Sequence, residues 1–168
     1  MGKRKLLISI ISICIILWPL LYGLLVFSGI WSIPDRTYLY VMKPISLILT
    51  LVVYVLFILN TTKVIKTLFQ FIQISLMSLS LILTVIFSYT DVYRYLGIID
   101  VNGVVAQDPI SCFYFSIVTY TTLGYGDYRP SPEARLFAAS EAFLGYILLG
   151  LFIGVLLQSI YKLQGDSS

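Results

Sequence analysis

The sequence Thr121-Thr122-Leu123-Gly124-Tyr125-Gly126-Asp127 is the segment around which the rest of the chain is organised. Two threonines, an aliphatic residue, a Gly-aromatic-Gly triplet and a carboxylate follow one another without a gap. Glycines at alternate positions tolerate unusual backbone dihedrals, so a strand of this composition can turn its carbonyl oxygens inward. Four copies around an axis would then offer rings of carbonyls that replace the water shell of a potassium ion. We therefore expect an ion-binding strand.

The composition is that of an integral membrane protein. Of the 168 residues, 59% are hydrophobic and 11% are charged, which excludes an ordinary soluble domain. A bilayer-spanning helix needs about 20 apolar residues. The apolar part of the first uncharged run is about twice the length of a signal-peptide core, so a retained helix is expected there. Four uncharged runs are candidate spans: residues 6–34, 44–62, 67–90 and 142–161.

A fifth uncharged run, residues 109–126, leads into the motif and is too polar at its end to be a simple span. Asp108 can cap free amides and Pro109 suits the first position of a helix. The helix that they predict has about three turns and is shorter than about 20 Å, which is too short to cross. Its negative carboxyl end would stop midway in the bilayer, where it favours a cation.

Longer helices are expected on either side of this short one. Residues 66–90 predict a helix uninterrupted by proline or glycine, followed by an outer loop in which the Asn-Gly pair at 102–103 is a turn signal. The last helix is expected over residues 131–162, with Ser131 as its cap and Pro132 in its first position.

Two ionisable residues lie within these spans. Lys43, about a turn inside the second helix, either snorkels to the outer interface or pairs with Glu141. An intramembrane carboxylate such as Glu141 should face protein or water. It either bonds the back of the short helix, pairs with Lys43, or acts as a proton-sensitive gating element. Gly145, one turn further along, is either a close-packing position or a bending point for a gate.

Charged residues indicate the orientation of the chain. The basic cluster at residues 3–5 favours a cytoplasmic N-terminus, and with four spans the C-terminus lies on the same side. The motif would then enter the membrane from outside. The first two helices lack arginines at every third position, which argues against voltage sensing of the usual kind. We expect a multi-pass protein of the cell membrane with both termini cytoplasmic.

One residue type that is common in catalytic sites is missing. The sequence contains no histidine, which removes the commonest general base and metal ligand. Cys14 and Cys112 both lie in apolar runs and are expected to be ordinary buried thiols. Together with the lack of a carboxylate pair suited to acid–base work, this argues against an enzyme, and no cofactor or nucleic-acid partner is expected.

The segment from residue 108 to about 158 resembles the pore module of potassium channels, which consists of a pore helix, a selectivity filter and an inner helix. The resemblance rests on the motif Thr121–Asp127, on the preceding residues 115–119 and on Gly145. It implies an all-α membrane protein with four transmembrane helices, a re-entrant pore helix and a filter loop, assembled as a homotetramer. Residues 64–168 would be the pore module, and residues 1–63 a peripheral two-helix hairpin outside the resemblance.

The resemblance also implies roles for single residues. Thr122, Leu123, Gly124 and Tyr125 would offer carbonyls to successive K⁺ sites, the permeant ion being the only ligand. The Thr122 hydroxyl would complete the innermost site. Gly126 would let the chain turn outward, and Asp127 would lie near the outer mouth.

Three residues depart from the family pattern. Leu123 stands where valine or isoleucine is usual, although its carbonyl serves equally. Phe115 stands where many relatives have a tryptophan that can bond the filter tyrosine, and phenylalanine has no such donor. Val118 stands where some relatives have a glutamate that bonds the filter-end aspartate. Filter support from Phe115 and Val118 is therefore expected to be weaker than usual.

The function expected from this resemblance is passive, potassium-selective permeation. A non-selective cation channel is the nearest alternative, although the intact Gly-Tyr-Gly triplet argues against it. A potassium-uptake transporter subunit is a second alternative; those proteins resemble four linked, degenerate filter repeats, whereas this chain has one intact repeat. A membrane enzyme or scaffold is a third.

Overall fold

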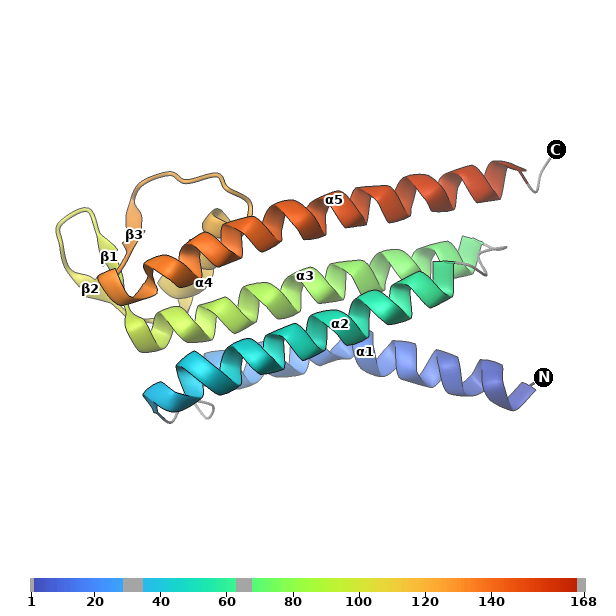
Figure 1. Ribbon diagram of the computed structural model, residues 1–168, viewed down its shortest axis with the longest axis horizontal. Helices are drawn as coiled ribbons and strands as arrows, with labels where there is room; N and C mark the ends of the chain where they lie inside the picture. The colour runs from blue at the N-terminus through green and yellow to red at the C-terminus, as the bar shows by residue number, and fades with distance from the viewer. Residues whose placement is uncertain (1, 29–34, 63–67, 166–168) are drawn as a thin grey trace.

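The computed structural model is a bundle of four long helices with one short helix and a small sheet at one end (Figure 1). It describes the backbone of residues 2–28, 35–62 and 68–165, and side chains within 13–28, 35–56, 71–158 and 160–161. Residues 63–67, at the expected domain boundary, lie outside these ranges, as do the side chains of the basic cluster at residues 3–5. The helices are α1 (Gly2–Ser28), α2 (Lys43–Thr62), α3 (Leu68–Leu96), α4 (Pro109–Tyr120) and α5 (Arg135–Gly165). The strands are β1 (Ile98–Asp100), β2 (Val105–Ala106) and β3 (Tyr128–Pro130).

Three helical segments within the described ranges are long and apolar enough to cross a membrane: Tyr38–Leu56, Phe71–Leu96 and Pro132–Gln158. The first combines a π-helical turn, Tyr38–Met42, with α2. The part of α1 whose side chains are described, Ile13–Ser28, is a shorter apolar helix. The structure thus confirms a mostly helical chain with three membrane-capable helices, and a fourth span stays a prediction.

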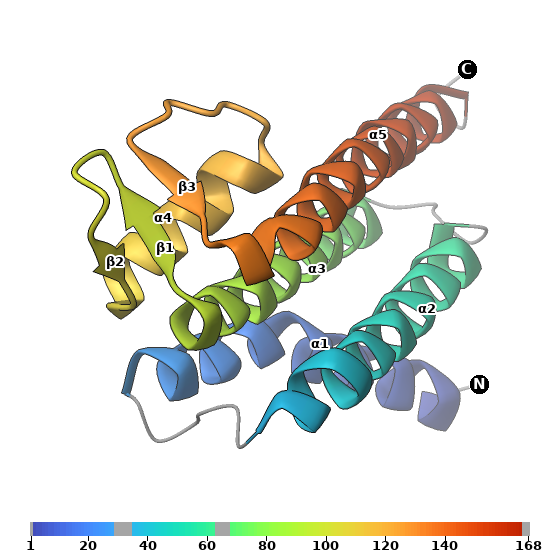
Figure 2. The same cartoon turned by 60° about the vertical axis from the view of Figure 1, so that its left-hand side comes forward.

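Helix α3 lies at the centre of the bundle and packs against α1, α2, α4 and α5 (Figure 2). Half of its membrane-capable window is buried inside the chain, whereas most of that of α2 and of α5 is exposed. Large side chains of α3, among them Val85, Tyr89 and Tyr93, pack in the main hydrophobic cluster with Phe115 from α4 and Leu148 from α5. Between membrane helices such packing stabilises through van der Waals contact, because lipid tails are as apolar as these side chains. Helices α4 and α5 are therefore held in place through α3.

Helix α3 continues beyond the end expected at residue 90 and stops at Leu96. Asp91 does not end the helix because its carboxylate is buried and paired, as described below. The outer loop is a β-hairpin in which the Asp100 carboxylate accepts bonds from the backbone N–H groups of Asn102 and Val104, at 2.9 and 2.8 Å. The Val104 bond, more than any other interaction, lowers the pKa of Asp100. The turn expected at residues 102–103 is confirmed.

The three strands form one antiparallel sheet in the order β2-β1-β3 (Figure 2). Ile98 pairs with both Ala106 and Pro130, so the chain that follows the Thr121–Asp127 segment is bonded to the hairpin that follows α3. Helix α5 then begins with a 3₁₀ turn in which Pro132 takes the first position, as expected. The prediction that Ser131 caps with its side chain is wrong. Its backbone carbonyl accepts from Ala134 N at 3.0 Å, while its hydroxyl is buried and has no partner within the described residues.

Candidate ion-conduction site

Helix α4 begins as the sequence predicts. The side chain of Asp108 accepts a hydrogen bond from Ser111 N at 2.9 Å, and Pro109 occupies the first turn. This bond is also the main reason why the pKa of Asp108 is lowered. With 12 residues at about 1.5 Å each, α4 is about 18 Å long and cannot cross a bilayer.

The end of α4 is tied to the start of the Thr121–Asp127 segment. Leu123 N donates to the carbonyl of Val118 at 2.9 Å, which closes the last turn of the helix. The carbonyls of this turn are therefore occupied, and the chain leaves the helix in a fixed direction. Two further bonds also connect the end of α4 to this segment: Thr121 N donates to Ile117 O at 2.9 Å and Thr122 N to Thr119 O at 3.0 Å.

Backbone dihedrals alternate in sign along the segment. Thr122, Gly124 and Gly126 have φ values of 55°, 56° and 82°, whereas φ is not positive at Leu123 and Tyr125. Glycine adopts positive φ at little cost, but a β-branched residue there is an outlier that persists only when its surroundings impose it. Alternation between left- and right-handed dihedrals rotates successive peptide planes so that their carbonyls face one side.

The carbonyl oxygens of this segment are free to bind a ligand. Within the part of the chain that the structure describes, no hydrogen bond to the carbonyls of residues 122–126 is found. The side chains of Leu123 and Tyr125 are also exposed, at 57% and 68%. Backbone carbonyls left without water or another partner at membrane depth are costly. The carbonyls of residues 122–126 are thus acceptors without a hydrogen-bond donor among the described residues.

Tyr114 supports the segment from α4, and sequence reasoning missed it. Its ring stacks on Tyr125, with centroids 6.5 Å apart and planes inclined by 4°, and its hydroxyl interacts with Asp127. Phe115, the predicted support, packs edge-on against Tyr93 of α3 at 4.8 Å instead. Adjacent residues of a helix point in different directions, so Tyr114 faces the segment while Phe115 faces the core. Val118 supports it through its backbone.

Glu141 is fully buried where α3, α4 and α5 meet. Its Oε2 accepts a hydrogen bond from the Tyr93 hydroxyl at 2.6 Å, and its Oε1 lies within hydrogen-bond distance of the Ser116 hydroxyl, at 2.5 Å. The prediction that Glu141 bonds the back of the short helix is therefore confirmed.

The alternative pairing of Glu141 with Lys43 is wrong, and so is snorkelling by Lys43. The ammonium group of Lys43 is buried against Asp91, at 2.8 Å from its carboxylate, and also donates to the hydroxyl of Tyr22. Because Asp91 belongs to α3, this pair joins the peripheral helices to the centre of the bundle.

Gly145 is a point of close approach between α5 and the end of α4. A Cβ atom there would collide with the backbone carbonyl of Tyr120. The close-packing interpretation of Gly145 thus has direct structural support, and its role as a hinge stays a prediction.

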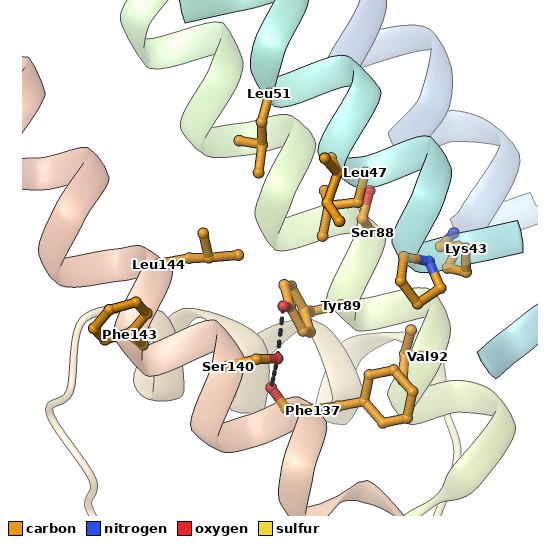
Figure 3. A pocket seen from close by; sticks show the side chains of 12 residues that line it. Lys43, Leu47, Leu51, Ser88, Tyr89, Val92, Phe137, Ser140, Phe143 and Leu144 are labelled. Carbon is orange, nitrogen blue, oxygen red and sulfur yellow. Dashed lines mark hydrogen bonds between the residues drawn. The ribbon is translucent and has the colours of Figure 1, made fainter. Parts of the chain in front are cut away.

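An apolar pocket of about 310 Å³ lies between α2, α3 and α5 (Figure 3). Leu47 and Leu51 line it from α2, and Phe143 and Leu144 from α5. At its base the hydroxyl of Tyr89 lies 2.9 Å from that of Ser140. Helix α2 is thus held by α3, and the pocket separates it from the middle of α5.

A helix too short to cross a bilayer, followed by a segment whose carbonyls are unbonded within the described residues, lies among membrane-capable helices. Such non-helical backbone is typical of proteins that line a watery path through a membrane. The chain belongs to the family described as "Ion channel", whose pattern matches residues 76–162. Over 60 residues it is 35% identical to the two pore potassium channel b of Oryza sativa subsp. japonica, covering 35% of this chain and 17% of that protein. Over 52 residues it is 40% identical to the two-pore potassium channel 1 of Arabidopsis thaliana, covering 30% and 14%.

The aligned stretch thus spans about a sixth of the length of these curated relatives. No solved structure matches the chain. The family match covers most of α3, all of α4 and all but the last turn of α5. Helices α1 and α2 lie outside it, as the sequence indicated.

Proposed function

We propose that this chain is one subunit of a potassium-selective channel, with residues Thr122–Gly126 as the filter. The observation that carries the proposal is the row of unbonded carbonyls at residues 122–126, combined with the alternating φ values. A desolvated K⁺ needs several oxygen ligands, and such carbonyls can replace its hydration shell. Two relatives that align with about a third of this chain are named potassium channels, which supports K⁺ as the permeant ion.

The carboxyl end of α4 contributes to the same site. This end lies directly before the first filter residue and carries the negative end of the helix dipole. Its carbonyls at Ile117, Val118 and Thr119 are bonded to the following turn, which aims the filter strand away from the helix. The dipole therefore favours a cation beside the inner end of the filter, where Thr122 stands.

One chain supplies one strand, and a ring of carbonyls needs several. We propose a homotetramer with closed fourfold symmetry, because that is the arrangement of potassium filters. Helix α5 supports it: its apolar side chains Leu136, Phe143 and Tyr146 are 84%, 68% and 70% exposed in the single chain. Neighbouring subunits would cover part of this surface and lipid the rest.

The arrangement of the termini supports the proposed topology. Helix α1 begins and α5 ends at the same end of the bundle, while the filter and the sheet lie at the other (Figure 1). With four spans, both termini would be cytoplasmic and the filter would open outside. Residues 1–63 would form a peripheral hairpin in each subunit, and residues 64–168 the pore module.

A non-selective cation channel is the alternative that the filter geometry must exclude. Tyr125 argues against this alternative because its ring stacks on that of Tyr114, which restrains the strand from the side. A restrained strand keeps its carbonyls at a fixed spacing, as selectivity by cavity size requires; selectivity by ligand number and field strength needs only that the carbonyls stay aligned.

Potassium flux into proteoliposomes tests the function with a matched pair of variants. Gly124→Ala places a side chain at φ 56° in the filter, whereas Gly103→Ala does so at φ 82° in the hairpin turn, and neither added Cβ meets a neighbour within the chain. Both substitutions carry similar backbone strain. We expect Gly124→Ala to lose potassium flux and Gly103→Ala to keep it. Equal flux through both variants would contradict the assignment of the filter.

A further inference from the structure

The buried carboxyl of Glu141 has no cation to balance a negative charge. Among the described residues, Lys43 and Arg36 are the cations within ion-pair distance of an acid, and they pair with Asp91 and Glu133. The titratable groups that face Glu141 are tyrosines: Tyr89 and Tyr93 from α3 and Tyr120 from α4. A fully buried carboxylate with no counter-charge is costly even when hydroxyl groups bond it.

The hydrogen atoms around Glu141 can be counted. The hydroxyl of Ser116 has one proton and two acceptors in reach, the carbonyl of Ile86 at 2.9 Å and Oε1 of Glu141 at 2.5 Å. If Glu141 is ionised, Ser116 can satisfy one of the two. If Glu141 carries a proton, it donates to Ser116 and Ser116 donates to Ile86. The hydroxyl of Tyr93 donates to Oε2 in both cases, at 2.6 Å.

We propose that Glu141 is a neutral carboxylic acid that acts as a positioning residue for the filter. Its proton completes a chain of hydrogen bonds from α5 through Ser116 of α4 to the backbone of α3. This chain holds the middle of α4 against the two long helices of the pore module. Two residues after Ser116, Val118 accepts the bond from Leu123, so the position of α4 sets the position of the first filter carbonyls.

A second contact, one turn along α5, acts in the same direction. Gly145 lets α5 approach the carbonyl of Tyr120, the last residue of α4. Helix α4 is thus held at its middle by Glu141 and at its end by Gly145. Loss of the neutral acid would leave the end contact alone, and the filter strand would gain freedom to shift.

The protonation state is tested by infrared difference spectroscopy on the full chain in lipid, comparing the unmodified protein with Glu141→Gln. We expect the unmodified protein at neutral pH to show the carbonyl stretch of a protonated carboxylic acid, and Glu141→Gln to lack it. A difference spectrum that contains a carboxylate band instead overturns the proposal. This readout requires no ion conduction, so it separates failure of the proposal from failure of the proposed function.

The positioning role, which rests on the proposed channel function, is tested by the sodium-to-potassium permeability ratio. A glutamine amide can donate to Ser116 and accept from Tyr93, so Glu141→Gln should keep the ratio. Glu141→Leu and Ser116→Ala remove the bonds and should raise it several-fold. Ser75→Ala is the control, because the Ser75 hydroxyl bonds a carbonyl of its own helix. An elevated ratio in Glu141→Gln, or an unchanged one in Ser116→Ala, overturns the positioning role.

Discussion

The buried pair of Lys43 and Asp91 predicts a large and asymmetric response to substitution. Their side chains are 8% and 2% exposed, and the nitrogen and oxygen atoms lie 2.8 Å apart. At an effective dielectric constant of about 20, the attraction at this distance is about 6 kcal/mol before desolvation is subtracted. Removing one partner leaves a buried charge without balance, which costs about 3–5 kcal/mol. We expect Asp91→Leu and Lys43→Met each to lose stability in this range.

The stability lost in the double variant should be smaller than the sum of the losses in the two single variants. Replacing both charged groups by uncharged side chains removes the desolvation cost together with the attraction, and such replacements are often neutral or stabilising by about 1–4 kcal/mol. The Lys43→Met/Asp91→Leu chain should therefore be more stable than either single variant. The assay is reversible unfolding in mixed micelles, read as a double-mutant cycle.

A second ion pair of the same chain is the control for this cycle. Arg36 and Glu133 lie 3.5 Å apart with side chains that are 73% and 50% exposed. Screening by solvent limits such a pair to about 0–1 kcal/mol, and substitutions there should have little effect. Single variants of the Lys43–Asp91 pair that lose no more than those of the Arg36–Glu133 pair would refute the reasoning. So would a double variant that loses the sum of the single losses.

Three further predictions concern α4 and its contacts. Gly145→Ala should impair tetramer formation or potassium flux, because its methyl group would displace the end of α4. The added methyl group of Gly150→Ala meets open space, so this control should keep both properties. Equal behaviour of the two variants in flux and native-gel assays would count against the contact. Tyr114→Ala should speed the decay of potassium current by freeing the ring of Tyr125, and Tyr114→Leu should not restore it; an unchanged decay time would show that the stacking is unimportant. Asp108→Ala should cost about 1 kcal/mol of stability through loss of the helix cap. Because the pKa of Asp108 is lowered in the folded chain, its contribution is present above the unfolded pKa and is lost as pH falls through the folded value; an Asp108→Ala penalty that persists in acid would contradict this.

The elements near the filter were predictable because local chemistry determines them. Asp108 and Pro109 fix the start of α4 by a cap and a ring-locked dihedral, and both act within one turn. The alternating glycines of the motif likewise have a local reason for positive φ. The conformation of such residues can be predicted from their immediate neighbours in the sequence.

The partners of the buried charges were not predictable from spacing. Lys43 meets Asp91 rather than Glu141 because α2 packs on α3 and a pocket separates it from the middle of α5, and no local pattern reports that arrangement. The same holds for the end of α3. The sequence predicted that this helix ends at residue 90, before the charged Asp91, but Asp91 is paired with Lys43 and the helix continues to Leu96. The strands β1 and β3 were also missed, since three-residue strands acquire their partners only when the chain folds.

The residues that support the proposed filter were predictable only in part. The sequence identified Phe115 and Val118 by their places in a family pattern, but the direction of each side chain depends on how α4 rotates about its axis. The structure turns Phe115 toward Tyr93 and Tyr114 toward Tyr125. Tyr114 could have been found as the aromatic residue on the opposite face from the buried positions Cys112 and Phe115.

The central claim is that the Thr122–Gly126 strand selects potassium. Its most direct test is the reversal potential of the purified protein in planar bilayers with potassium on one side and sodium on the other. We expect the unmodified protein to give a reversal potential close to the potassium equilibrium potential. In Gly124→Ala, where current remains, we expect the reversal potential to shift toward zero. A current through the unmodified protein that reverses near zero would contradict potassium selectivity and favour a non-selective cation pore.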